Sequence, residues 1–477
     1  MSRVVIIGGG ISGLAAAYRL AQTAPKAVVT LVESDWRLGG KIVTERVDGF
    51  VIEGGPDTFL SYKPRGLGLC RELGLENRLH GTNEMIRRTY VMRGGKLYEL
   101  PEGLTGLIPS RFEPMLKTGL ISPLGKLRMG LDFLLQPRSA NGDESLAAFV
   151  KRRLGREVYV HLIEPLLSGI YAGDGELLSL AATFPQLRQT ELEYGGLIKG
   201  MLAVKAKASP PKPGGKRWAA FLTPTTGLAE IVEALVARLG GIDVRLGNRA
   251  VRAEAASTGY IVQLANNESL AADAVIFATP AFVTADLISD LDPQLAATLR
   301  AIPYASTATV SVAYPLTDIP RPLDGYGYII PQAEARAILA CTWTSTKFPH
   351  RAPEGFGLIR AFIGRFGQEN ALAATDEELL TLVREELRRT LGITAPPRLH
   401  RIFRWPNAMP QYTLGHLDRL TVIDRRLMAR PGLFVAGNAY RGIGLPDCIT
   451  SGEAAAEAAL KFLPWSLPEQ PLVSHFG

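Results

Sequence analysis

The run Gly8-Gly-Gly-Ile-Ser-Gly13 constrains the fold more than any other part of this chain. It follows a short apolar run, Arg3 to Ile7, and precedes an alanine-rich segment, Leu14 to Gln22, which predict a buried strand and a helix. A second apolar run, Val28 to Glu33, predicts the next strand. The chain therefore begins with a βαβ unit, which is typical of α/β proteins with a parallel sheet.

The turn between the first strand and the helix has the residues that a nucleotide pyrophosphate requires. Glycines at positions 8, 10 and 13 let the backbone approach a phosphate closely and leave the N–H groups of the helix N-terminus free. Glu33 follows Gly13 by twenty residues, where a carboxylate accepts hydrogen bonds from a ribose 2′-hydroxyl. The pattern predicts a dinucleotide, either NAD or FAD. A glycine-rich turn without a ligand is the alternative.

Composition excludes several classes of protein. The 477 residues include 53 Lys and Arg against 46 Asp and Glu, a net charge of +7 that is too small and too dispersed to indicate a nucleic-acid partner. The three cysteines lie far apart and no histidines have metal-ligand spacing, so we expect no disulfide and no metal site. No stretch reaches the roughly eighteen consecutive apolar residues that a membrane-spanning helix requires.

Two later segments of the chain again combine short apolar strands with a helix, as expected for further parts of a cofactor-binding domain. Apolar residues from Leu228 to Leu239 have helical spacing, and strands are predicted over Ile242 to Leu246, Tyr260 to Leu264 and Ala274 to Phe277. A last strand, Leu433 to Val435, precedes a glycine-rich loop and a helix predicted from about Ser451 to Phe462.

Two insertions separate these segments. Residues 61 to 221 have helical periodicity, with a basic, proline-containing stretch over 199 to 218 that predicts an exposed loop. Residues 300 to 405 look strand-rich, most clearly over Thr307 to Val312 and Leu358 to Ile363. We expect these insertions to contact the substrate.

The sequence resembles the FAD-binding start of the flavin amine oxidase superfamily. The resemblance covers VVIIGGGISGLAAAYRL, VTLVESDWRLGGKI and GFVIEGGPDTF near the N-terminus, NRAVRAE in the middle, and LFVAGNAYRGIGLPDCITSGEAAAEAAL at the C-terminus. It favours non-covalent FAD over NAD. A helix N-terminus near the flavin N1 and C2 carbonyl would stabilise the negative charge that develops on reduction.

The resemblance implies a set of cofactor-binding residues drawn from all three segments. They are Gly8, Gly9, Gly10, Ile11, Ser12, Gly13, Glu33, Arg37, Gly40, Lys41, Gly55, Pro56, Asp57, Thr58, Val251, Trp405, Gly437, Ile443, Gly444 and Leu445. Val251 stands where the superfamily places a small apolar residue behind the adenine. Trp405 is either an aromatic contact to the flavin or a core tryptophan.

Within the superfamily the chain most resembles the porphyrinogen oxidases. The distinctive runs are LLSGIYAGDGELLSLAATFPQL, GYGYIIP, MPQYTLGH and GLPDCITSG. The resemblance implies oxidation of coproporphyrinogen III or protoporphyrinogen IX to the porphyrin, with dioxygen as acceptor and hydrogen peroxide as product. The run ACTWTSTKFPHRAPEG favours the coproporphyrinogen-using branch. Two alternatives stay open: an amine or carotenoid oxidase of the same fold, and a flavin-free protein-binding relative.

The same resemblance implies residues that hold a tetrapyrrole. They are Arg88, Gly169, Tyr326, Gly327, Ile329 and Phe362. Arg88 would bind a propionate, although Arg87 fits nearly as well and either arginine could be a solvated surface residue. Ile329 and Phe362 could equally be ordinary core residues, because apolar strand residues usually pack internally.

No side chain is expected to act as a catalytic acid, base or nucleophile, because the flavin N5 accepts the hydride and a pyrrole N–H loses the proton. Lone histidines such as His161 and His416 are more often structural. Asp174 is expected to organise a turn or cap a helix. Cys448 precedes the C-terminal helix and does not predict a covalent flavin link.

We expect an α/β protein with a discontinuous Rossmann-like FAD-binding domain, a mixed-sheet substrate domain and a helical insertion. The FAD-binding domain would comprise residues 1–60, 222–285 and 415–477. The substrate domain would comprise 61–87, 203–221 and 286–414, with the helical insertion at 88–202.

Leucines over Met115 to Leu135 have helical spacing among basic residues, a pattern that fits either peripheral membrane contact or internal packing. We therefore expect a cytoplasmic protein that can attach to the inner membrane face. A homodimer is also compatible with the sequence.

Overall fold

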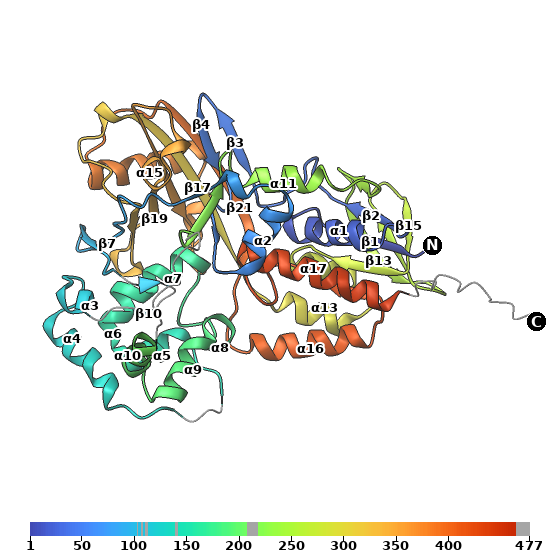
Figure 1. Ribbon diagram of the computed structural model, residues 1–477, viewed down its shortest axis with the longest axis horizontal. Coiled ribbons are helices and arrows are strands. Elements are labelled where there is room, and N and C mark those ends of the chain that lie inside the picture. The colour runs from blue at the N-terminus through green and yellow to red at the C-terminus, as the bar shows by residue number, and fades with distance from the viewer. Residues whose placement is uncertain (103, 106–107, 110–112, 139–141, 208–217, 464–477) are drawn as a thin grey trace, which may run out of the picture.

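The computed structural model of this chain describes all residues except 103, 106–107, 110–112, 139–141, 208–217 and 464–477. Figure 1 shows a parallel sheet with its helices at one end of the molecule, a larger sheet at the other end, and a group of helices beside that larger sheet.

The first sheet has five parallel strands in the order β12-β2-β1-β16-β22. Its strands are β1 (Arg3–Ile7), β2 (Val28–Val32), β12 (Asp243–Arg245), β16 (Ala274–Phe277) and β22 (Leu433–Val435). The predicted bounds of β1, β16 and β22 are confirmed, and Glu33 lies one residue beyond β2. Strands far apart in the sequence are direct neighbours, since Ile6 pairs with Ile276 and Ile276 with Phe434.

Each face of this sheet is covered by its own apolar cluster. On one face pack α1 (Ile11–Thr23), α11 (Ala229–Val236) and α17 (Leu445–Phe462), with buried residues such as Leu14, Ile231 and Ile449. On the other face lie a small sheet and further helices, centred on Phe277 and Leu295. These elements are β13 (Ala250–Ala255), β14 (Tyr260–Leu264), β15 (Ser269–Ala272), α12 (Ala281–Leu287), α13 (Pro293–Arg300) and α16 (His416–Met428).

The second sheet is mixed and has seven strands in the order β21-β17-β20-β19-β18-β7-β8. Its strands are β7 (Tyr90–Arg93), β8 (Lys96–Glu99), β17 (Tyr304–Pro315), β18 (Gly327–Ile329), β19 (Ile338–Trp343), β20 (Phe356–Ile363) and β21 (Leu399–Pro410). All neighbouring strands are antiparallel except β18 and β7. The α/β class with a mixed-sheet second region is thus confirmed.

One face of the mixed sheet packs against α15 (Asp376–Leu391). This helix begins with a capping box in which Thr375 and Glu378 exchange hydrogen bonds, and it buries Leu379, Val383 and Leu387. The sheet side chains of this apolar cluster include Tyr328, Cys341, Ala361 and Ile363. Because strand side chains alternate between faces, their neighbours Ile329, Ala340 and Phe362 point to the opposite face.

The helical insertion runs from α3 to α10 and has its own apolar core around Phe149 and Leu162. Its elements are α3 (Glu113–Lys117), α4 (Pro123–Gly130), η2 (Leu131–Phe133), α5 (Leu146–Leu154), α6 (Arg156–Val158), η3 (Tyr159–Ile163), α7 (Glu164–Tyr171), α8 (Leu180–Thr183), α9 (Pro185–Tyr194) and α10 (Leu197–Lys207).

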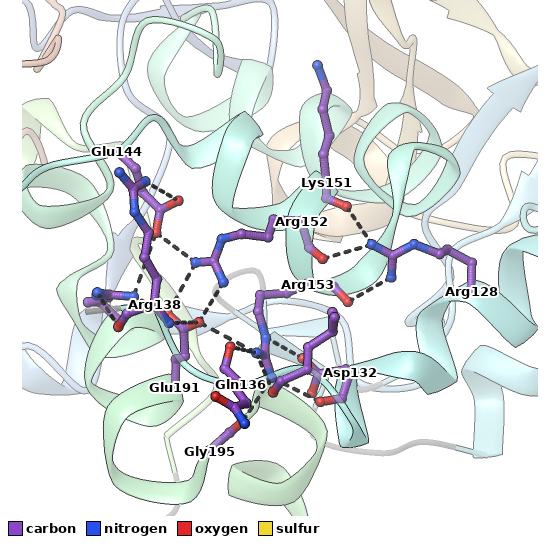
Figure 2. Close-up of polar contacts among 12 residues, drawn as sticks. Arg128, Asp132, Gln136, Arg138, Glu144, Lys151, Arg152, Arg153, Glu191 and Gly195 are labelled. Atoms are coloured by element: carbon purple, nitrogen blue, oxygen red, sulfur yellow. Dashed lines mark hydrogen bonds and ion pairs between the residues drawn. The ribbon is translucent and has the colours of Figure 1, made fainter. Parts of the chain in front are cut away.

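Figure 2 shows the charged groups that join the helices of this insertion. The fully buried Arg153 donates to Asp132 at 2.6 Å and to the carbonyl of Gly195 at 3.0 Å. Glu191 accepts hydrogen bonds from Arg152 at 2.7 Å and from the backbone N–H of Arg138 at 3.3 Å. Buried ion pairs of this kind fix one arrangement of the elements that carry them, because breaking one leaves an uncompensated charge.

The remaining elements are short. They are β3 (Thr44–Val47), β4 (Phe50–Glu53), β5 (Phe59–Leu60), α2 (Pro64–Glu72), η1 (Glu76–Arg78), β6 (Leu79–Gly81), β9 (Leu104–Thr105), β10 (Ile108–Pro109), β11 (Phe221–Pro224), η4 (Leu316–Asp318), η5 (Gln332–Glu334), α14 (Thr344–Lys347), η6 (Pro349–Arg351) and η7 (Asn370–Ala373). In the part of the chain described here, no helix combines the length and the apolar character that crossing a membrane requires.

Three sequence predictions need correction. The C-terminal helix begins at Leu445 rather than near Ser451, so Cys448 lies inside its first turn. Residues 61 to 221 contain short strands, of which β7 and β8 extend the mixed sheet. The basic stretch predicted as a loop over 199 to 218 is helical as far as Lys207, because Leu197, Ile198 and Met201 pack into the core of the insertion; positions 208–217 of that stretch lie outside the described residues.

Candidate functional site

The turn between β1 and α1 has the geometry of a phosphate-binding turn. Gly8 has φ +108°, a conformation that other residues rarely adopt, and a Cβ on Gly13 would lie 1.9 Å from the Gly8 carbonyl oxygen. A Cβ on Gly10 would meet no atom within 4 Å. Glycine at positions 8 and 13 is therefore required by the fold, whereas the open space at Gly10 leaves room for a ligand at the helix N-terminus.

Glu33 lies beside this turn, as predicted. Its carboxylate accepts the backbone N–H of Gly9 at 2.6 Å and that of Asp35 at 2.8 Å. The side chain remains half-exposed, so its oxygens retain acceptor capacity for a ribose hydroxyl. Val251 lies at an irregularity in the pairing of β13 with β14 and has a 39 % exposed side chain.

The loop after β2 packs directly on the turn. Gly39 donates its N–H to the Gly9 carbonyl at 2.8 Å, and Arg37 donates to the Gly40 carbonyl at 2.6 Å. The Lys41 ammonium donates to the Ala408 carbonyl at 2.5 Å, and among the described residues no carboxylate forms an ion pair with it. Burial lowers the pKa of Lys41 to about 8, although its side chain keeps some solvent contact. Lys41 thus offers a cation to an anionic ligand.

The N-terminus of α17 lies beside the N-terminus of α1. Ser12 donates its hydroxyl to the Cys448 carbonyl at 2.9 Å, and a Cβ on Gly452 would lie 2.0 Å from the Ser12 carbonyl oxygen. Ile443, Gly444 and Leu445 form the entry to α17. Two helix N-termini therefore point to one region of the molecule, an arrangement that favours binding of an anionic group.

The loop that precedes α17 is held by the phenol of Tyr412. This hydroxyl accepts the N–H of Gly442 at 2.8 Å and donates to the Asn438 carbonyl at 2.7 Å. Gly437 donates its N–H to the Ser451 hydroxyl at 3.0 Å, and a Cβ there would meet no atom within 4 Å. A second open position thus lies beside the second turn of α17.

Residues 54 to 58 connect this region to the mixed sheet. A Cβ on Gly55 would lie 1.8 Å from the Lys41 carbonyl oxygen, so this segment packs tightly against the loop after β2. Asp57 forms an ion pair with Lys347 at 2.9 Å and accepts the Thr58 hydroxyl at 3.0 Å. Burial alone would raise the pKa of Asp57, but the cations Lys347 and Arg360 hold it well below its usual range.

The mixed sheet brings some of the predicted substrate residues together. Ala340 of β19 pairs with Ile329 on one side and with Phe362 on the other, so both half-buried side chains lie on the face away from α15. Gly327 packs so closely on β19 that a Cβ would lie 2.0 Å from the Cys341 carbonyl oxygen. Tyr326 donates its hydroxyl to the Asn83 carbonyl at 2.6 Å.

Gly169 and Arg88 lie outside this group. Gly169 is exposed on α7, and a Cβ there would meet no atom within 4 Å. The backbone of Arg88 contacts that of Tyr326, but its 56 % exposed side chain pairs with Asp324 at 3.1 Å. Arg87 is more exposed and donates to the Glu84 carbonyl. A role for Arg88 or Arg87 in substrate binding stays a prediction.

Two of the side chains considered, His416 and Asp174, have structural contacts, whereas the buried Nδ1 of His161 has no hydrogen-bond partner within the described residues. His416 is fully buried, lies 2.9 Å from the Tyr440 carbonyl oxygen and stacks on the Tyr412 ring at 4.1 Å. Burial lowers the pKa of His416 to about 4, which keeps the ring neutral. Asp174 accepts the N–H of Glu176 and so organises a turn.

Sequence reasoning missed Arg360, Thr309 and the buried pair formed by Glu53 and Arg351. Trp405, Thr309 and Arg360 all donate to the Gly54 carbonyl, at 2.8, 3.0 and 3.1 Å. The only available signal was an arginine inside an apolar strand, LIRAFI, where a charged residue requires a buried partner.

Comparison with known proteins identifies the family to which this arrangement belongs. Residues 11–460 match the family described as flavin containing amine oxidoreductase. The chain belongs to this family. Its cofactor is FAD, and the glycine turn, Glu33 and the two converging helix N-termini fit that cofactor.

Relatives cover nearly the whole chain. The coproporphyrinogen III oxidase of Bacillus subtilis is 38% identical over 465 residues, covering 96% of this chain and 98% of that protein. The protoporphyrinogen oxidase of Homo sapiens is 32% identical over 484 residues, covering 96% and 98%. A solved structure from Exiguobacterium sp. 255-15 has a TM-score of 0.84 and 32% identity, covering 96% and 99%.

Substitution of Gly10 tests the nucleotide turn. We expect Gly10→Val to fold, because φ at this position is −69° and the space is open, but to retain less than about a tenth of the wild-type FAD. Absorbance of the purified protein gives the FAD content. Gly240→Val, at another open glycine, is the matched control and should keep full occupancy. Full occupancy in Gly10→Val would contradict the site.

The pKa of Lys41 predicts how FAD binding depends on pH. Because the ammonium loses its proton near pH 8, and an anionic ligand favours the charged form, we expect FAD affinity to fall as the pH rises through about 8. Lys41→Met should bind FAD more weakly at pH 6.5 and lose this pH dependence. Titration of apoprotein with FAD, followed by flavin fluorescence, measures both effects, and an unchanged pH profile in Lys41→Met would assign the titration to another group.

Proposed function

We propose that this protein is a porphyrinogen oxidase of haem biosynthesis that oxidises coproporphyrinogen III to coproporphyrin III. In this proposal dioxygen is the electron acceptor and hydrogen peroxide is released, and protoporphyrinogen IX is the second candidate substrate. The similarity of nearly the whole chain to a bacterial coproporphyrinogen III oxidase carries the proposal. An amine or carotenoid substrate is not favoured, since relatives named for porphyrinogens match 96% of the chain.

In this proposal the parallel sheet belongs to the part that binds FAD, and the mixed sheet belongs to the part that binds the substrate. Residues 1–60, 222–285 and 415–477 would bind FAD, since they supply the parallel sheet and both helix N-termini. Residues 286–414 would bind the substrate through strands β17 to β21 of the mixed sheet, with residues 61–87 and 203–221 as the other parts of the substrate domain. Residues 88–202 would form the helical insertion, apart from β7 and β8, which lie in the mixed sheet. Bound FAD supplies the hydride acceptor for the substrate and passes the electrons to dioxygen.

The chain's own side chains bind and orient the substrate in this proposal. Ile329 and Phe362 would provide an apolar wall for the flat macrocycle, because both remain half-buried on the face of the sheet away from α15. Tyr326 and Gly327 would border this wall, and Gly169, on α7, would contact the macrocycle from the other side. Arg88 would hold a propionate by a charge-assisted hydrogen bond, in exchange for its exposed pair with Asp324. His416 is neutral and already bonded, so no role as a base is assigned to it.

Incubation with the reduced macrocycles tests the proposed function. The holoenzyme should convert coproporphyrinogen III to a fluorescent porphyrin in air, consuming dioxygen and releasing hydrogen peroxide. Faster conversion of protoporphyrinogen IX would exchange the two substrates. Turnover of a polyamine or a carotenoid, without porphyrin formation, would refute the proposal.

Substitution of Arg88 tests the propionate contact. We expect Arg88→Ala to raise KM for coproporphyrinogen III about tenfold, because one charge-assisted hydrogen bond contributes about 1.5 kcal/mol. The FAD content and kcat should remain unchanged. Arg87→Ala is the matched control and should leave KM within about twofold. The reverse result would assign the propionate to Arg87.

We also propose that the helical insertion contacts an anionic membrane surface. Leu124 and Leu127 of α4, with Leu131 and Leu134 after it, expose 78, 69, 42 and 78 % of their area. Between them Asp132 is fully buried. It is bound to Arg153 (Figure 2) and accepts the N–H of Ile198 at 2.8 Å. The buried Asp132 therefore fixes the segment that carries the exposed leucines, and Lys126 of α4 adds positive charge beside them.

Vesicle sedimentation tests this contact. Leu124→Ser with Leu127→Ser should lower binding to phosphatidylglycerol vesicles at least tenfold, since each buried leucine contributes about 1.5 kcal/mol or more. Leu316→Ser, at a 51 % exposed leucine far along the chain, is the control and should bind as the wild type does. Equal binding by all three proteins would exclude this surface as the contact.

A homodimer remains a prediction from the sequence.

A further inference from the structure

The carbonyl oxygen of Gly54 accepts three side-chain hydrogen bonds from three neighbouring strands of the mixed sheet. The donors are the hydroxyl of Thr309 on β17, the guanidinium of Arg360 on β20 and the indole of Trp405 on β21. The same guanidinium nitrogen of Arg360 also donates to the Gly55 carbonyl, at 2.5 Å. A carbonyl oxygen has two lone pairs, so this acceptor is saturated and the segment at Gly54 and Gly55 is fixed to the sheet.

Arg360 is buried without a carboxylate partner. Only 3 % of the residue is exposed, and across the described residues no carboxylate oxygen lies within ion-pair distance of its guanidinium. The two nearby acids already have partners, since Asp57 pairs with Lys347 at 2.9 Å and Glu53 with Arg351 at 2.8 Å. Three cations therefore face two anions in this part of the protein.

This excess charge is costly for the folded chain. An arginine stays charged even when buried, and Asp57 and Glu53 offset this charge only in part, because both lie beyond ion-pair distance and already pair with other cations. An apolar side chain on β20 would avoid this cost, as Leu358 does two residues earlier on the same face. The Nε of Arg360 also has no hydrogen-bond partner in the protein. These observations indicate that the charge acts on a group outside the chain.

The position of Arg360 indicates which group this is. Its two acceptors belong to the segment that packs against the Lys41 carbonyl, within the region assigned to FAD. On its other side, the guanidinium carbon lies 4.7 Å from the centre of the Phe362 ring, which belongs to the apolar wall assigned to the substrate. Arg360 thus lies between the two assigned sites without being exposed to either.

We propose that Arg360 is a positioning residue for the oxidation, one that holds the Gly54–Gly55 segment against FAD and whose unpaired charge favours two-electron-reduced FAD over the oxidised form. This inference rests on the proposed function, because it places FAD beside the segment. A fixed positive charge in a region of low dielectric constant stabilises an electron-rich group nearby. The mutual arrangement of FAD and the substrate wall would then depend on one side chain.

The midpoint potential of bound FAD tests the proposal. We expect Arg360→Gln, which keeps an N–H donor but removes the charge, to shift the equilibrium between reduced and oxidised FAD at least tenfold toward the oxidised form. This shift corresponds to a potential about 30 mV more negative for a two-electron couple. Arg360→Lys keeps the charge and should restore most of the potential. Thr309→Val removes a neutral donor to the same carbonyl and should cause a clearly smaller shift.

Each outcome has one interpretation. Equal potentials for Arg360→Gln and Thr309→Val would overturn the inference, because a purely structural hydrogen bond would then explain both variants. If Arg360→Gln does not fold, Arg360→Met, which also removes the charge, takes its place. A shift toward oxidised FAD that Arg360→Lys does not share would support the inference, and equal potentials for Arg360→Met and Thr309→Val would overturn it. A wild-type protein that cannot bind FAD would instead refute the proposed function.

Discussion

Backbone contact between α1 and α17 is the constraint on which the candidate site depends. A helix can approach another this closely only where side chains are absent, and Gly452 meets the Ser12 carbonyl at such a point. The contact places the first turns of both helices side by side, where Ser12 bonds the Cys448 carbonyl. Because the partial positive charges of both N-termini then act on one region, a dinucleotide phosphate and an electron-rich ring can be stabilised together.

The second constraint is the alternation of side chains on β20. Ile359, Ala361 and Ile363 pack toward α15, whereas Leu358, Arg360 and Phe362 face the other way. A single strand therefore supplies the core of its own sheet, a charged contact to the segment at Gly54, and an apolar ring at the proposed substrate wall. If β20 paired with β17 one residue out of register, its two sets of side chains would change faces. Arg360 would then point toward α15, into the apolar core.

Much of the cofactor region could be predicted from the sequence because its signals are local. The glycine spacing and Glu33 lie within thirty-three residues, and the buried strands of the parallel sheet are short, unbroken apolar runs. The start of α17 was predicted too late because Gly442, Gly444 and Pro446 are typical of a loop, although proline and small residues also suit the first turn of a helix.

The remaining features depend on contacts between distant residues. The strands β7 and β8 were missed because their sequences, YVMR and KLYE, mix apolar with charged residues, whereas the equally short β16, AVIF, is an unbroken apolar run. Arg360 bonds carbonyls that lie 306 and 305 positions earlier in the chain, and no local pattern encodes such a contact. The side-chain position of Arg88 likewise follows from Asp324, which the sequence gives no reason to place beside it.

The order of the strands in the parallel sheet has a consequence for biosynthesis. β1 leaves the ribosome first, yet its neighbour β16 follows some 270 residues later and β22 more than 150 residues after that. On one side β1 therefore has no strand to pair with until β16 has been translated. A nascent chain that stops before α17 lacks one of the two helix N-termini at the candidate cofactor site, so binding of the coenzyme must await the synthesis of α17.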